Sequence, residues 1–166
     1  MSMKITDFGL SRVSFKETQG IVKKTSPAGT VLFMAPEIVR LRLGEKSEKR
    51  LTTKMNVHIK KKPYDPFSAD IWALGVMLYV MVTKNYPFKL KGKSKMYVSQ
   101  INRDYPFPTK VSPQLKLFIG SMLNPNPINR ITIIGVITHP WVDPDGTLIK
   151  LDQEMEQKFK IQNKIA

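Results

Sequence analysis

The run Ile71–Val82 constrains the fold more than any other part of the sequence. It is hydrophobic throughout and is interrupted only by Gly75. With its flanks, Ser68–Thr83, it is long enough for about four helical turns. A helix that is apolar on every side has to be buried by other elements. The run is also shorter than the ~18 apolar residues that a membrane-spanning helix needs. We therefore predict a core helix and no membrane span.

Two further helices are predicted from their N-terminal caps. Ser112 precedes Pro113, a residue favoured at the first helical position, and this helix is expected to run to about Leu123. Thr132 is expected to cap a second helix over Ile133–Ile137. Helical spacing predicts that the apolar residues of the first point inward, namely Leu115, Phe118, Ile119 and Met122.

Together with the remaining sequence patterns, these helices predict a mainly α fold class. An amphipathic helix is expected over Ser94–Ile101, and the tail, residues 143–166, is expected to be helical because Leu151, Met155 and Phe159 recur every four residues. The stretch 38–63 holds nine Lys or Arg, two Glu and little apolar periodicity. We therefore predict that it is a solvated basic insertion.

The charge of the chain raises the question of its partners. Lys and Arg number 27 against 13 Asp and Glu, a net charge of +14. Such a balance attracts nucleic acids or anionic surfaces, but no nucleic-acid-binding motif accompanies it. We therefore do not expect a nucleic-acid partner. The chain has no Cys, hence no disulfide framework, and no signal-peptide pattern. The expected location is intracellular, in the cytoplasm.

Four motifs follow one another in an informative order. They are Asp7-Phe8-Gly9, then Gly29-Thr30 with Ala35-Pro36-Glu37, then Asp70–Gly75, then Met122–Thr132 followed by His139-Pro140-Trp141. In this order and spacing they resemble the carboxyl-terminal lobe of serine/threonine protein kinases of the calmodulin-dependent type. The run Leu74–Phe88 more narrowly resembles testis-specific serine kinases. Residues 1–142 are thus expected to be a truncated C-terminal kinase lobe that starts at the Asp-Phe-Gly motif.

The resemblance implies a cofactor. In a complete kinase the Asp-Phe-Gly motif helps to bind ATP and Mg²⁺, so Asp7, Phe8 and Gly9 are the candidate cofactor residues. Asp7 would be the metal ligand, since Mg²⁺ prefers carboxylate oxygen. Phe8 would pack beneath it, and Gly9 would permit the turn. This chain alone is expected to bind neither ATP nor Mg²⁺ tightly.

The resemblance also assigns residues of the activation segment. Ser26 and its neighbour Thr25 are the candidate phosphorylation sites, and a phosphate there would pair with Arg or Lys. The candidate substrate pocket is formed by Pro27, Thr30, Val31 and Met34.

Three further residues are expected to be structural. Glu37 and Arg130 are expected to pair and tie the activation segment to the helices, because Arg offers a two-pronged fork to a carboxylate. Asp70 resembles a carboxylate that accepts backbone N–H groups of the catalytic loop. Alternatively, it serves only as an acid in the first turn of its own helix.

Motifs that are absent from the chain limit its expected activity. It contains no glycine-rich G-x-G-x-x-G loop, no Val-Ala-Ile-Lys lysine and no His-Arg-Asp catalytic loop. No catalytic residue is therefore assigned, and the chain alone is expected to be inactive. The predicted function is that of a fragment of a serine/threonine kinase, which transfers the γ-phosphate of ATP to protein Ser or Thr when complete. The alternative is a non-catalytic lobe that binds a partner kinase or a substrate protein.

Overall fold

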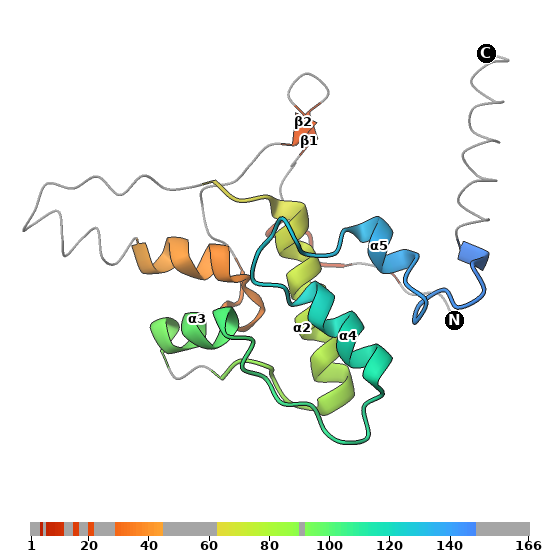
Figure 1. The fold of residues 1–166 in the computed structure, drawn as a ribbon. Helices are drawn as coiled ribbons and strands as arrows, with labels where there is room; N and C mark the ends of the chain where they lie inside the picture. Colours follow the sequence, from red (N-terminus) through yellow and green to blue (C-terminus); the bar gives the residue numbers. More distant parts are fainter. Residues whose placement is uncertain are drawn as a thin grey trace, which may run out of the picture.

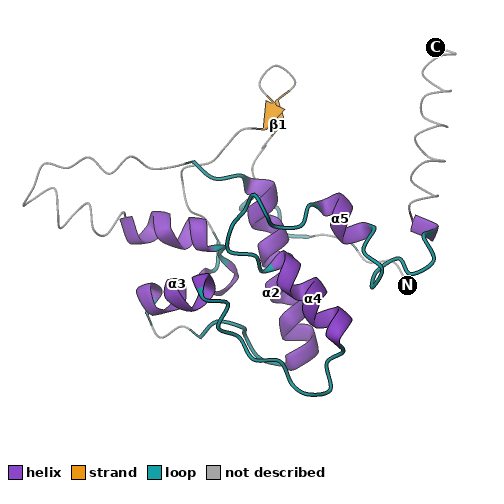
Figure 2. Ribbon diagram, viewed as in Figure 1, coloured by secondary structure: helices purple, strands orange, loops and turns teal. Residues whose placement is uncertain are grey.

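Helix α2 (Pro66–Thr83) runs through the middle of the fold, and α4 (Pro113–Met122) packs along it (Figure 1). The computed structural model describes residues 4, 6–11, 15–16, 20–21, 29–44, 63–89 and 92–148. The predicted tail helix and residues 45–62 of the predicted insertion lie outside this part of the chain. The described residues are mostly helical, as the sequence predicts (Figure 2).

The other elements are shorter. Strands β1 (Phe15–Lys16) and β2 (Gly20–Ile21) pair antiparallel, with Phe15 opposite Ile21. The 3-10 turn η1 (Val31–Phe33) leads into a helix over residues 36–44. Helices α3 (Lys93–Ile101) and α5 (Ile133–Ile137) follow the core helix in sequence.

The capped helices begin where their caps predict. Ser112 Oγ accepts a hydrogen bond from the Leu115 N–H at 3.3 Å, and Thr132 accepts one from the Gly135 N–H. All four residues predicted to face inward from α4 are buried. Helix α2 begins two residues before the predicted Ser68, because Asp65 caps it and Pro66 takes the first helical position.

The core forms where α2, α4 and the residues before the helix 36–44 meet. Trp72, Val76 and Tyr79 of α2 pack with Phe118, Ile119 and Met122 of α4, and the Trp72 ring stacks on Phe88 with ring centroids 5.5 Å apart. Helix α2 is long and apolar enough to cross a membrane by length and composition alone. These core contacts are those expected of a central helix in a globular fold.

Two predictions are corrected here. Residues 38–44, assigned to the solvated insertion, continue the helix 36–44 and bury Ile38, Val39 and Leu41 against the core. Their apolar residues have helical spacing, which the neighbouring basic residues obscured. Helix α2 is also not buried on every side: Met77 and Met81 are 46% and 67% exposed. No element in the described part of the chain covers that face.

Gly75 marks the closest approach of α2 to α4. A Cβ at this position would lie 2.8 Å from Met122 Cβ and 3.1 Å from Leu123 Cδ2, both in the buried core. A methyl group there would force the two helices apart. Gly120 of α4 differs, since a Cβ there would meet only the Tyr105 hydroxyl, at 3.8 Å.

We therefore expect opposite effects from two matched substitutions. Gly75→Ala should lower the free energy of unfolding by about 1–3 kcal/mol through overpacking. Gly120→Ala should leave it unchanged or raise it by about 0.5–1 kcal/mol, because Ala favours helix over Gly. Urea denaturation followed by circular dichroism would measure both. Equal midpoints for the two variants would contradict the close helix crossing.

Candidate functional site

Arg130 lies in the loop between α4 and α5 and joins three segments of the chain. Its Nη1 and Nη2 groups donate to Glu37 Oε1 at 2.8 Å and Glu37 Oε2 at 3.0 Å. Nη1 also donates to the Ser68 carbonyl at 2.7 Å, and Nε donates to the Asn124 carbonyl at 2.9 Å. The structure thus brings Glu37 and Arg130 together in the two-pronged geometry that favours Arg over Lys.

The pair is almost completely removed from water. The Arg130 side chain is 0% exposed and the Glu37 side chain 10%. The guanidinium also lies over the Trp72 ring, 5.1 Å from its centroid, where the ring face attracts a cation. Burying a charge is unfavourable unless it is paired and hydrogen-bonded. Here the carboxylate, two backbone carbonyls and the indole together compensate for the lost water.

Two groups near this pair, Tyr64 and Asp70, have raised pKa values. Burial raises the pKa of Tyr64, and the charges of Asp70 and Glu37 raise it further. Asp70 is exposed, yet partial desolvation of its carboxyl raises its pKa, with an added contribution from the charge of Asp65. Among the described residues, no group donates a hydrogen bond to the Asp70 carboxylate. Asp70 is the fifth residue of α2 and lies beyond its first turn, which contains no acidic residue, so the alternative that it serves as a first-turn acid is wrong.

The Asp7-Phe8-Gly9 motif forms a tight turn. Asp7 has a left-handed backbone, with φ at 62°, and its Oδ1 accepts a hydrogen bond from the Gly9 N–H at 3.3 Å. The Ser11 N–H closes the turn on the Phe8 carbonyl. Phe8 is 68% exposed, so the expectation that it packs beneath Asp7 is corrected.

Three residues of the predicted substrate pocket, Thr30, Val31 and Met34, lie in the part of the chain that the structure describes. Thr30 is exposed and Val31 is half-buried. Met34 instead packs in the core, only 3% exposed, and its carbonyl accepts a hydrogen bond from Gln100 Nε2 of α3 at 2.8 Å. Pro27 and the two phosphorylation candidates, Thr25 and Ser26, lie outside the described residues.

Some contributors to the site were not predicted. Asn124 accepts from Arg130 through its backbone carbonyl, which every residue carries, so no sequence signal could single it out. Ser68 accepts through its backbone carbonyl and also through its side-chain Oγ, at 3.2 Å. Gln100 is fully buried and ties α3 to Met34. The sequence offers one sign of this role, because Gln100 is a polar residue on the inward side of an amphipathic helix. A buried amide needs a hydrogen-bond partner.

One site residue suits magnesium. The Asp7 carboxylate is exposed at the tip of its turn. Mg²⁺ is commonly held by one or two carboxylates together with substrate phosphates and water. No group of three or more His, Cys, Asp or Glu that could hold a metal occurs among the described residues. Asp7 therefore fits a metal whose other ligands are phosphate oxygens and water.

Known proteins resemble this chain over most of its length. A family profile described as "Protein kinase domain" matches residues 1–142. Similar proteins include CBL-interacting protein kinase 20 of Oryza sativa subsp. japonica, 32% identical over 141 residues, or 84% of this chain. CBL-interacting serine/threonine-protein kinase 7 of Arabidopsis thaliana is 31% identical over 140 residues, also 84%. The aligned parts make up 26% and 28% of those proteins, so the chain spans about a quarter of their length.

The buried pair leads to a stability prediction. Arg130→Ala should strand the Glu37 carboxylate in a nearly dry site and lower the free energy of unfolding by about 3–5 kcal/mol. Arg40→Ala is the matched control, because Arg40 is exposed on the helix 36–44. Thermal unfolding would compare the two. Equal midpoints would show that the pair does not stabilise the fold.

The raised pKa of Asp70 gives a second prediction. A carboxyl whose pKa is higher in the folded than in the unfolded state destabilises the fold when it is ionised. Asp70→Asn should therefore raise the thermal midpoint at pH 7. The gain should shrink as the pH falls through the folded pKa and vanish below the ordinary Asp value of 3.8. Asp145→Asn, a change in an exposed turn, is the control. A gain of the same size for both variants would contradict the prediction.

Proposed function

The chain belongs to the protein kinase family, of the serine/threonine type, and we propose that it provides the activation segment and helical lobe of an enzyme that phosphorylates proteins. The complete enzyme would transfer the γ-phosphate of ATP to a Ser or Thr hydroxyl. The narrower likeness to testis-specific serine kinases stays a prediction.

The buried Glu37–Arg130 pair carries this proposal. It fixes the residues just after Thr30 and Val31 to the α4–α5 loop, across 93 residues of sequence. Catalysis of phosphoryl transfer depends mainly on the positioning of substrate and phosphate. A rigid attachment at the end of the activation segment would hold a substrate-binding loop in place for that purpose.

Asp7 would hold the metal in this enzyme. Bound Mg²⁺ would neutralise charge on the ATP phosphates during transfer. The hydrogen bond from the Gly9 N–H orients the Asp7 carboxylate at the exposed tip of the turn. Thr30 and Val31 would contact the protein substrate near its acceptor hydroxyl. Phosphorylation of Ser26 or Thr25 would add negative charge to the same segment.

A second candidate function is a non-catalytic interaction module. The observation that favours it is that Met77 and Met81 leave an apolar face of α2 exposed. Such a lobe would bind a partner kinase or a substrate protein without transferring phosphate.

The chain of 166 residues should not transfer phosphate by itself. The base, the phosphate-binding lysine and the glycine-rich loop act together, so their joint absence should remove nearly all activity. Purified chain with ATP, Mg²⁺ and a generic Ser/Thr protein substrate would be assayed for ³²P incorporation. Activity comparable to that of an intact kinase, and abolished by Asp7→Asn, would contradict this expectation.

A chimera separates the two candidate functions. Residues 1–142 would replace the matching segment of a CBL-interacting kinase, and phosphorylation of Ser/Thr substrates would be measured. If the lobe serves catalysis, the chimera should be active, and Asp7→Asn should lower its rate by at least about a hundredfold. The control Lys110→Gln, at an exposed turn residue, should change it little. A folded but inactive chimera would instead support the interaction module.

A further inference from the structure

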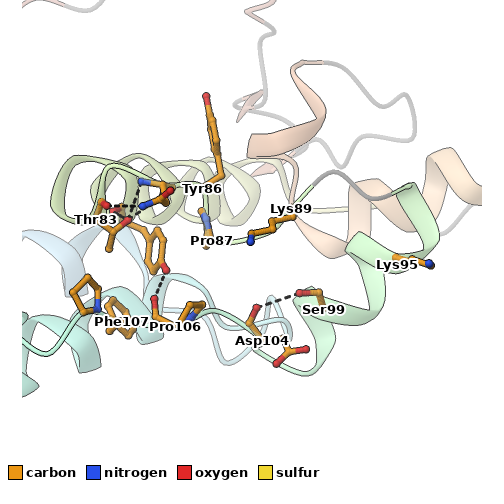
Figure 3. A pocket seen from close by; sticks show the side chains of 12 residues that line it. Thr83, Tyr86, Pro87, Lys89, Lys95, Ser99, Asp104, Pro106 and Phe107 are labelled. Atoms are coloured by element: carbon orange, nitrogen blue, oxygen red, sulfur yellow. Dashed lines mark hydrogen bonds between the residues drawn. The ribbon is translucent and has the colours of Figure 1, made fainter.

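A pocket of about 600 Å³ lies between the end of α2, the turn after it, α3 and the segment 104–108. This volume falls within the range of ligand-binding sites in proteins. Pro106 and Phe107 line one end and Lys95 lines the other, with Lys89 between them (Figure 3). Tyr79, which also lines the pocket, packs against Phe107. The pocket therefore has an aromatic end and a basic end.

The aromatic end is preformed. Tyr79 is packed against Phe107 and Tyr105, with ring centroids 5.2 and 5.8 Å away, and its hydroxyl donates to the Pro106 carbonyl. Pro87, Pro106 and Pro108 also line the pocket, and their rings restrict the backbone. A wall that is already ordered loses little entropy when a ligand binds, which favours binding.

The basic end belongs to a concentrated charge cluster. Residues 84–95 contain five Lys and no Asp or Glu. Of these lysines, Lys89 and Lys95 line the pocket and are exposed. Asp104 is the single acidic residue in its lining. The positive charge at the rim is thus larger than the negative charge.

We propose that this pocket is a docking site for an acidic protein segment that carries an aromatic side chain. The ring would pack on the exposed Pro106 and the half-buried Phe107, where offset or edge-to-face contacts with an aromatic residue are favourable. Carboxylates that flank it in the segment would meet Lys89 and Lys95. A polyanion without apolar side chains would use the lysines alone and leave the aromatic end empty.

The position of the pocket connects it to the activation segment. Tyr86 lines the pocket and meets Phe33 of η1 edge to face, with ring centroids 5.8 Å apart. A segment bound here would lie beside the residues that we propose to contact substrate. Docking itself does not depend on phosphoryl transfer, so it can be tested on this chain without any kinase assay.

Binding of defined peptides tests the proposal. The whole 166-residue chain would be titrated into fluorescein-labelled Gly-Glu-Glu-Phe-Glu-Glu-Gly and followed by fluorescence anisotropy. Replacing the peptide Phe by Ala should weaken binding by about tenfold or more, the loss expected for a buried aromatic side chain. Replacing its Glu residues by Gln should also weaken binding. Equal affinity for the Phe and Ala peptides would show only general charge attraction and overturn the proposal.

Protein variants locate the site. Lys89→Glu with Lys95→Glu should lower the affinity by about tenfold, whereas Lys4→Glu with Lys116→Glu, the same charge change outside the pocket lining, should change it less than about twofold. Ser99→Phe adds a ring to the pocket wall without removing a core residue and should block the peptide. Circular dichroism would verify that each variant is folded. Unchanged affinity in folded Ser99→Phe would overturn the proposal.

Discussion

The structure depends on one buried cation. Arg130 donates to Glu37, Ser68 and Asn124 and thereby joins the residues after η1, the first turn of α2 and the end of α4. Because its side chain is fully buried, every one of these acceptors is needed to compensate for lost hydration. The contact is directional, since a planar fork matches two carboxylate oxygens at once. It therefore fixes the relative placement of segments that are distant in sequence.

Close packing of two helices supplies the second constraint. At Gly75 helix α2 lies so near α4 that no Cβ fits, and the buried rings of Trp72 and Phe118 lie in the same core. This packing uses only part of the surface of α2. The exposed Met77 and Met81 belong to a helix whose composition suits burial on all sides. In a complete kinase, that face would be available to further elements of the lobe.

Charge is distributed in a way that matters for binding. The net charge of +14 is a sum over both signs, 27 Lys or Arg against 13 Asp or Glu. One cluster of lysines, at residues 84–95, borders a pocket with aromatic walls, whereas Asp7 presents a carboxylate on its own exposed turn. The two proposals thus concern separate regions of the lobe: a metal with phosphate at the Asp7 turn, and acidic protein segments at the pocket.

The sequence by itself determined the features that rest on local chemistry. Caps at Ser112 and Thr132 fixed the starts of two helices, helical spacing identified the buried face of α4, and the motif order indicated the family and the Glu37–Arg130 pair. Tertiary structure decided the features that local sequence patterns cannot predict. It placed residues 38–44 in a packed helix despite their basic neighbours, left one face of α2 exposed, and brought the Ser68 and Asn124 carbonyls to Arg130. Every residue carries the same backbone carbonyl, and the burial of a residue depends on which distant segments pack against it. Only the folded chain could therefore decide these points.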